Sequence, residues 1–64
     1  NILANPLIEL AEELSRRVGT GGQIILTGIL DGQAGSVLAA YEPFFEFSVP
    51  VRQDGWVRLE GTRR

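Results

Sequence analysis

The chain has 64 residues, a formal net charge of −2 at pH 7, and neither cysteine nor histidine. The composition therefore excludes a disulfide framework and thiolate or imidazole metal sites, and we predict no metal site. The acidic balance argues against a nucleic-acid-binding module, which usually presents a basic stripe. No apolar run approaches the roughly 20 residues of a membrane span, so we predict no membrane contact and a cytoplasmic location.

The first seven residues, Asn1 to Leu7, form an apolar segment with an asparagine at positions 1 and 5, followed by a proline. Such a segment is typical of the carboxyl end of a buried parallel strand, where open α/β sheets bind ligands. We predict that at most Asn1 to Ala4 are the end of a strand whose earlier residues are not in this chain.

An amphipathic helix is predicted from Pro6 to about Arg17. Its apolar face repeats at intervals of three and four residues and consists of Leu7, Leu10, Ala11, Leu14 and Val18. Asn5 is the expected N-cap, because its side-chain oxygen can accept a backbone N–H from the first turn. Pro6 then takes the first helical position, and Gly19 ends the helix.

A strand and a second helix follow a turn at residues 20–22. The strand is predicted over Gln23–Gly28, whose continuous apolar run is typical of a parallel strand covered on both faces. The helix begins at Asp31 or Gly32 and ends before Pro43. Its predicted buried face consists of Ala34, Val37, Leu38 and Tyr41.

An antiparallel hairpin is predicted at the end of the chain, with Asp54-Gly55 as its two-residue turn. The first strand spans Phe44–Arg52 and lies at a sheet edge, because Pro50 cannot donate to a ladder. Its predicted inner face consists of Phe45, Phe47, Val49 and Val51. The return strand spans Trp56 to about Gly61, with Val57 and Leu59 on one face, and the last three residues are expected to fray.

The element order is therefore strand end, helix, strand, helix and hairpin. Strands that alternate with helices predict an α/β fold in three layers with a mostly parallel sheet. A parallel sheet needs right-handed crossovers, so the first helix requires an earlier strand.

Four stretches of the chain resemble a known family: residues 1–7 (NILANPL), 21–30 (GGQIILTGIL), 39–41 (AAY) and 55–61 (GWVRLEG). They are similar to the carboxyl-terminal part of class I S-adenosylmethionine-dependent methyltransferases. More narrowly, they resemble the enzymes that methylate the eleventh protein of the bacterial large ribosomal subunit. The resemblance covers all 64 residues, and it implies that residues 1–64 are an incomplete, carboxyl-terminal portion of a Rossmann-like catalytic domain.

The resemblance implies a strand order and a site. The sheet of this family has seven strands, and the return strand should lie between Gln23–Gly28 and Phe44–Arg52. The family's Asn or Asp after the fourth strand matches Asn1, which is therefore expected beside the cofactor S-adenosylmethionine. Asn5 is the candidate substrate contact, and no catalytic residue is assigned. The implied activity is methyl transfer to amino groups of a large-subunit ribosomal protein, without direct nucleic-acid contact.

The family's Gly-rich loop and its ribose-binding acidic residue have no counterpart here, so the 64-residue chain is expected to be inactive. Two alternatives remain open. One is a class I methyltransferase with another acceptor, and the other is a stand-alone α/β dimerisation module. An unpaired hydrophobic strand edge at Gln23–Gly28 would also favour homo-oligomers of the 64-residue chain.

Overall fold

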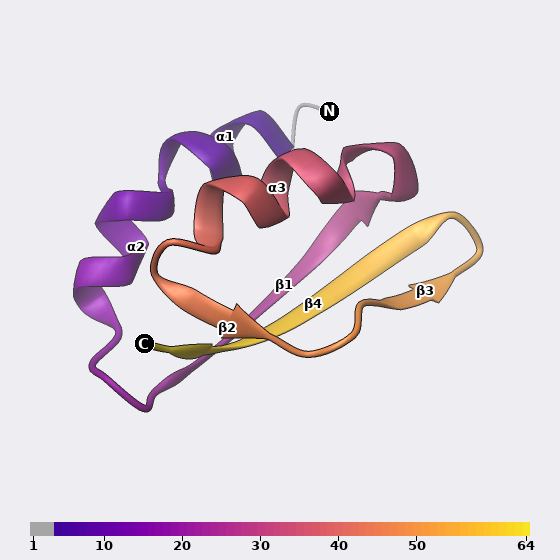
Figure 1. Cartoon of the computed structure of the whole chain (residues 1–64). Coiled ribbons are helices and arrows are strands. Elements are labelled where there is room, and N and C mark those ends of the chain that lie inside the picture. Colours follow the sequence, from indigo (N-terminus) through magenta and orange to yellow (C-terminus); the bar gives the residue numbers. More distant parts are fainter. Residues whose placement is uncertain (1–3) are drawn as a thin grey trace.

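A computed structural model describes residues 4–64 of the chain. These residues form three α-helices, a short 3-10 helix and four strands, and Figure 1 shows how they are arranged. In chain order these are α1 (Ala4–Glu9), α2 (Ala11–Arg17), β1 (Gln23–Leu30), η1 (Asp31–Gln33), α3 (Ala34–Tyr41), β2 (Phe45–Phe47), β3 (Val51–Gln53) and β4 (Trp56–Arg63). The predicted order of helix, strand, helix and hairpin is confirmed.

The last strand, β4, lies in the middle of the sheet. The strand order is β1-β4-β2, and β3 pairs with β4 on the same side as β2. This confirms that the return strand lies between the other two. Each described pairing is antiparallel, so the predicted mostly parallel sheet is wrong for residues 4–64. Because β1 and β2 are both antiparallel to β4, they run in the same direction without touching.

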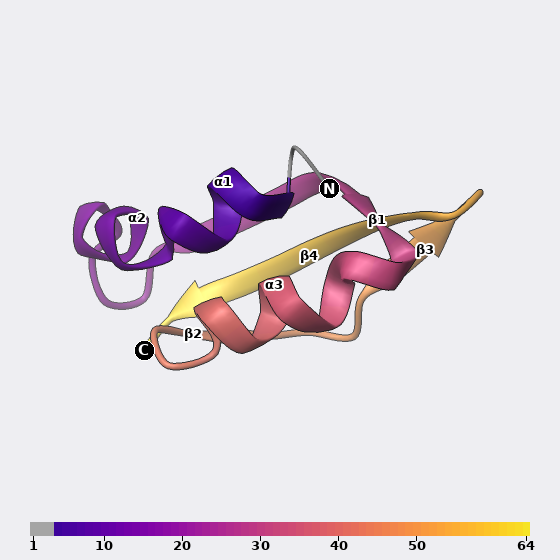
Figure 2. The same ribbon diagram turned by 90° about the horizontal axis from the view of Figure 1, so that it is seen from above.

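The helices form one layer over one face of the sheet (Figures 1 and 2). Along β4 the buried residues Val57, Leu59 and Gly61 alternate with the more exposed Trp56, Arg58 and Glu60, as a sheet with one covered face requires. The other face is open in the described residues, so they form two layers instead of the predicted three. On β1 this leaves Ile25 60% exposed, whereas the apolar run predicted cover on both faces.

The core lies between α3 and the covered face of the sheet. Its largest fully buried side chains are Tyr41, Phe45, Ile29, Leu59, Val37 and Val57. The rings of Tyr41 and Phe45 lie 6.1 Å apart between centroids, in a tilted arrangement that aromatic pairs favour. The predicted buried face of the second helix is confirmed, with Leu38 only half-buried.

The predicted first helix is divided at Leu10. This residue has φ −92° and ψ 2°, which lies in the bridge region and not in the α-helical one. The bend allows both short helices to pack on α3 and leaves Leu10 exposed, against the prediction. The helix also begins at Ala4, so Asn5 lies in its first turn and not at the N-cap. Pro6 is tolerated there, since first-turn N–H groups have no partner within a helix.

The predicted strand Phe44–Arg52 is divided into β2 and β3 around Ser48–Pro50. Pro50 has no N–H to donate, and Val49 is 84% exposed, so the predicted inner face ends at Phe47. Strand β1 is two residues longer than predicted. Its pairing passes from Leu26–Leu59 to Ile29–Val57, so β1 contains a bulge with Gly28 at φ 75°.

The carboxyl end is held in place, so the predicted fraying is wrong. Strand β4 continues to Arg63, which pairs with Phe45. The Arg63 Nε donates to the Ser15 carbonyl at 2.9 Å, and the Arg64 Nε donates to the Glu42 carbonyl at 2.9 Å. Two arginine side chains thus satisfy carbonyl oxygens near the carboxyl ends of α2 and α3, as cations at helix ends commonly do.

Candidate functional site

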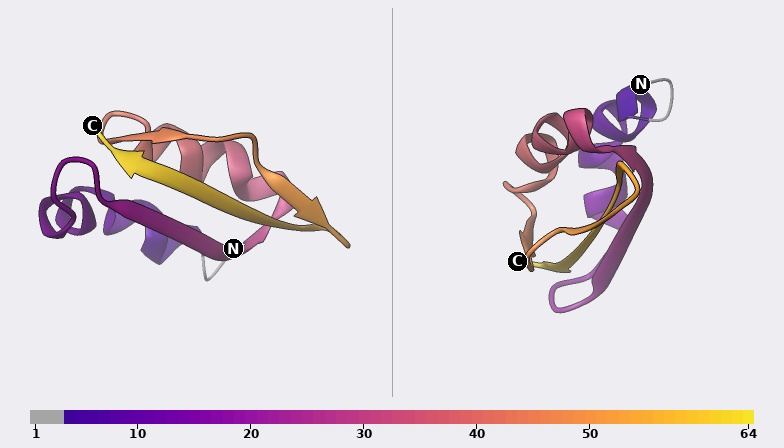
Figure 3. Two further views of the ribbon diagram at one scale, coloured as in Figure 1. Left: turned by 90° about the horizontal axis from the view of Figure 1, so that it is seen from below. Right: turned by 90° about the vertical axis from the view of Figure 1, so that its right-hand side faces the viewer.

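The first residues of α1, the end of β1 and η1 lie at the same end of the molecule (Figures 1 and 3). Ala4 begins α1 and is buried in the core. A strand that led into α1 and ran parallel to β1 would end beside the carboxyl end of β1. Ligands bind at the carboxyl ends of the strands in open α/β sheets, so this end of the molecule, called the candidate edge below, is the candidate site.

The structure describes one of the two site residues that were expected from the sequence. Asn1 lies outside the described residues. Asn5 is exposed in the first turn of α1, at the candidate edge, where a ligand from outside the chain can reach it.

The carboxyl end of β1 is fixed to the β3–β4 hairpin. The Asp31 N–H donates to the Gly55 carbonyl at 2.8 Å, and the Asp31 carboxylate pairs with the Arg52 Nε at 2.8 Å. The Leu30 N–H donates to the Gln33 side-chain oxygen at 3.3 Å. These contacts hold one wall of the candidate edge in a defined position. Sequence reasoning missed the Asp31–Arg52 pair, because it joins residues from two separate elements.

Tyr41 fastens α1 to α3. Its side chain is 0% exposed, and its hydroxyl donates to the Leu7 carbonyl at 2.7 Å. Burial raises the pKa of Tyr41 above its ordinary value, because an ionised phenolate would lose hydration. The sequence indicated the buried ring but not the partner of its hydroxyl. Because a buried tyrosine hydroxyl usually has a hydrogen-bond partner, the sequence could have predicted that an acceptor lies near Tyr41, but not which one.

The open face of the sheet has two hollows away from Asn5. The first has a volume of about 350 Å³ and lies beside the bulge, with Trp56 and Val51 among its lining residues. The second, of about 230 Å³, is more polar and is lined by Gln23, Glu46, Ser48, Glu60, Gly61 and Thr62. Both gather residues from separate strands, so sequence reasoning missed them. The glycine at 28 was a signal, since an isolated glycine in a strand often marks a bulge.

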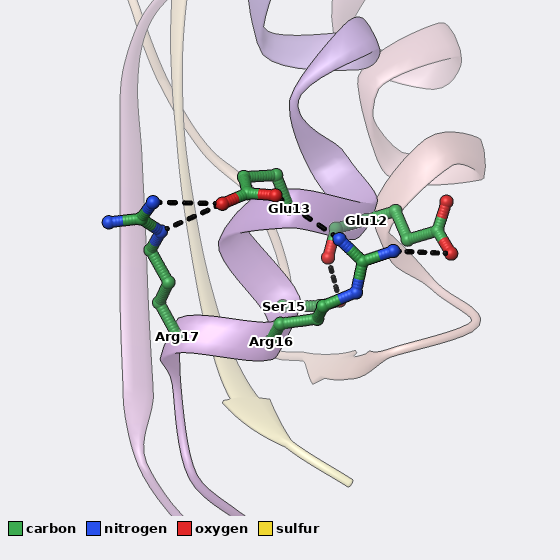
Figure 4. Close-up of polar contacts among 5 residues, drawn as sticks. All are labelled: Glu12, Glu13, Ser15, Arg16 and Arg17. Carbon is green, nitrogen blue, oxygen red and sulfur yellow. Dashed lines mark hydrogen bonds and ion pairs between the residues drawn. The ribbon is translucent and has the colours of Figure 1, made fainter.

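The adjacent carboxylates of α2 are engaged in surface ion pairs (Figure 4). Glu12 contacts Arg16 at 3.2 Å, and Glu13 contacts Arg17 at 2.8 Å, all with exposed side chains. Each pair joins residues four apart on the helix surface, and the two neighbouring carboxylates do not form a facing acid–base pair. Among residues 4–64, no group of three or more His, Cys, Asp or Glu side chains is placed to hold a metal ion. None of the described helices is long and apolar enough to cross a membrane.

Residues 4–64 on their own do not fit S-adenosylmethionine. A nucleoside site of this kind needs a carboxylate free to accept from ribose hydroxyls at a strand end. Asp31 follows β1, and its carboxylate forms an exposed ion pair with Arg52 at the candidate edge. The Gly-x-Gly-x-x-Gly turn that such a site also uses for the phosphate or methionine side does not occur in the chain, so the described residues provide one side of a site at most.

Comparisons with a family model and with known proteins identify the same family. The family model described as "Ribosomal protein L11 methyltransferase (PrmA)" matches residues 1–64. A protein of the same description from Azotobacter vinelandii is 52% identical over 64 residues, which are 100% of this chain and 22% of that protein. The one from Methylococcus capsulatus is 54% identical over 65 residues, again 100% of this chain and 22% of the relative. The chain therefore spans about a fifth of the length of these curated relatives.

Proposed function

Because this chain belongs to the ribosomal protein L11 methyltransferase family, we propose that residues 1–64 are the carboxyl-terminal portion of such an enzyme's catalytic domain. The intact enzyme transfers methyl groups from S-adenosylmethionine to amino groups of a large-subunit ribosomal protein. A ribosomal substrate is consistent with a cytoplasmic location.

The observation that carries this proposal is the place of β4. It lies antiparallel between β1 and β2, which run in the same direction, as the resemblance implied for a Rossmann-like methyltransferase sheet. An incomplete domain also accounts for the exposed Ile25 on β1 and for the absence of a partner beyond β1 among residues 4–64. The alternative of a stand-alone dimerisation module has no comparable support.

In this proposal Asn1 lies beside the cofactor and the incoming amine. Methyl transfer from a sulfonium to a neutral amine is an in-line displacement, so its rate depends mainly on how the two groups are positioned. An asparagine carbonyl accepts from the amine N–H groups and orients the nitrogen lone pair without itself titrating. Asn5, exposed in the first turn of α1, is proposed to contact the protein substrate.

The test uses the full-length protein that contains this chain. It is incubated with methyl-labelled S-adenosylmethionine and the purified ribosomal protein, and methylation is followed by mass spectrometry. Asn1→Ala is expected to lower kcat by tenfold to about a hundredfold, the scale of loss from misplaced reacting groups. Asn5→Ala is expected to raise the KM for the ribosomal protein. Arg16→Gln, on the exposed face of α2, is the control.

Two results would contradict the proposal. One is a full-length protein that methylates a different acceptor and leaves the ribosomal protein unmodified. The other is micromolar binding of S-adenosylmethionine by the 64-residue chain in calorimetric titration, since that chain provides one side of the site at most.

A further inference from the structure

We propose that the larger hollow on the open face, beside the β3–β4 hairpin, receives a lysine or arginine side chain of the protein substrate, with Trp56 and Asp54 as the residues that recognise it. Such a side chain is an aliphatic stem that ends in a positive charge. The inference rests on the function proposed above and adds a second point of contact for the same substrate, separate from Asn5.

The walls of this hollow include large apolar side chains that are exposed. Trp56 is 48% exposed and Val51 is 45% exposed, and both line the hollow of about 350 Å³. Val51 lies opposite Arg58, two residues after Trp56, so both apolar side chains are on the open face. Gly28, at the bulge of β1, also lines the hollow and has no side chain to fill it. The stems of lysine and arginine pack on surfaces of this kind, and tryptophan is enriched among residues that dominate binding energy.

The hollow also has a carboxylate that the described residues do not neutralise. Asp54, at the hairpin turn, lines the hollow, is exposed, and forms no ion pair within residues 4–64. Arg58, the other charged residue of the lining, is paired with Glu60 at 2.9 Å. A side chain that enters the hollow therefore meets an unbalanced negative charge and an aromatic ring, and both attract a cation.

The hairpin that carries these residues is fixed at the candidate edge. The Asp31 N–H donates to the Gly55 carbonyl at 2.8 Å, and the Asp31 carboxylate pairs with Arg52 at 2.8 Å. Figure 1 shows the β3–β4 turn at the same end of the molecule as the carboxyl end of β1. A protein substrate whose amine lies at the candidate edge can therefore contact the hollow with a neighbouring segment. Because the surface is preformed, little ordering is needed on binding.

Charge favours the ribosomal protein as the occupant. Proteins that bind RNA carry many lysine and arginine side chains, because the phosphate backbone is a polyanion. This chain has 8 acidic and 6 basic residues. All six basic side chains are arginines, and within residues 4–64 each forms an ion pair or donates to a backbone carbonyl. A second copy of these residues would therefore bring no unpaired cationic side chain to Asp54, whereas a basic protein brings many.

Two substitutions in the full-length protein test the carboxylate and the apolar wall separately. Asp54→Asn removes the charge and keeps the turn, because Asn-Gly adopts the same positive φ values as Asp-Gly. Trp56→Ala removes the aromatic wall. Glu46→Gln is the matched control, since Glu46 is also an exposed carboxylate without an ion pair within residues 4–64. Glu46 lies opposite Thr62, six residues from Trp56 along β4 and thus roughly 20 Å away, beyond the Debye length of about 8 Å at physiological salt.

Trp56→Ala is expected to raise the KM for the ribosomal protein by about tenfold. Asp54→Asn is expected to raise it by about threefold at low salt and by less at high salt, where the charge is screened. For both variants, kcat and the KM for S-adenosylmethionine should stay within about twofold of the wild type, and Glu46→Gln should match the wild type throughout. If Trp56→Ala does not fold, the salt-dependent effect of Asp54→Asn decides the question.

Three results would overturn the docking site and leave the proposed function standing. The first is a wild type that methylates the ribosomal protein and variants with unchanged KM values. The second is a large fall in the melting temperature of Trp56→Ala at an unchanged KM, which would show that another part of the same polypeptide covers the hollow. The third is a dimer that Trp56→Ala dissociates, which would identify a second copy as the occupant. A wild type without methyl transfer to the ribosomal protein would overturn the proposed function, and this inference with it.

Discussion

The guanidinium of Arg63 joins the last strand to a helix end that lies 48 positions earlier, through a 2.9 Å hydrogen bond from its Nε to the carbonyl oxygen of Ser15. The same side chain donates to the Phe44 carbonyl at 3.3 Å and lies 5.9 Å above the Phe44 ring. The planar guanidinium has several N–H donors and a flat face, so it makes these contacts at the same time, whereas a compact ammonium group cannot. Arg63 thus connects β4 to α2 and to the residue directly before β2.

Replacement of Arg63 by Lys is expected to lower the free energy of unfolding by about 1–3 kcal/mol, because a single ammonium group cannot replace the guanidinium nitrogens that donate to both the Ser15 and the Phe44 carbonyls. Urea denaturation of the 64-residue chain measures this change. Arg58→Lys is the control, because Arg58 pairs with Glu60 at 2.9 Å on the exposed face and should change stability by under about 1 kcal/mol. Equal effects of the two substitutions would contradict a special role of Arg63.

Two glycines are expected to respond to alanine in opposite directions. A Cβ at Gly61 would lie 2.7 Å from Cε1 of Phe47, so Gly61→Ala should destabilise the chain by about 1–3 kcal/mol. A Cβ at Gly35, within α3, would meet nothing within 4 Å, so Gly35→Ala should stabilise by about 0.5–1 kcal/mol. The melting temperatures of the two variants measure these effects, the steric clash at Gly61 and the helix preference at Gly35. A Gly61→Ala variant more stable than the wild type would show that Phe47 of β2 is not packed on β4 as described.

Alkaline conditions should destabilise the fold through Tyr41. Burial raises its pKa in the folded state above the ordinary 10.0, so its contribution is fully present below pH 10 and is lost as pH rises through the folded pKa. The chain has one tyrosine and neither cysteine nor lysine. Urea denaturation between pH 8 and 11 should show a steeper loss for the wild type than for Tyr41→Phe. Parallel curves would contradict a buried hydroxyl.

Self-association of the 64-residue chain is expected through β1. Within residues 4–64 this strand pairs with β4 on one side, and Ile25 is exposed beside the free edge. An unpaired, apolar strand edge is a template for pairing with a second copy. Light scattering at increasing concentration should give masses above the monomer, and Ile25→Lys should restore the monomer. Val49→Lys, at an exposed position outside the strands, should not, and a monomeric wild type at high concentration would disprove the prediction.

Local chemistry allowed several elements to be predicted well. The Asp54-Gly55 pair predicted a hairpin turn, and both residues have the positive φ that such a turn needs, 55° and 82°. The spacing of Ala34, Val37 and Tyr41 predicted the buried face of α3 correctly. These features depend on residues close together in the chain, whose preferences act before any tertiary contact forms.

The candidate site was predictable only in part. The resemblance indicated Asn1 and Asn5, and the structure places Asn5 at the candidate edge, while Asn1 lies outside the described residues. The contributions of Tyr41 and of the Asp31–Arg52 pair were not predictable, because each joins positions more than 20 residues apart. No local pattern specifies which distant carbonyl or carboxylate a side chain will meet.

The sequence by itself therefore determined the order of the elements, the hairpin turn and the apolar faces of α3 and β4, since these follow from backbone preferences and from periodicity. Only the tertiary structure decided the bend at Leu10, the interruption before Val51 and the ordering of the last residues around Arg63. Each of these depends on which surfaces meet when the helices pack on the sheet. Buried carbonyl groups must then find donors wherever the fold brings one within reach.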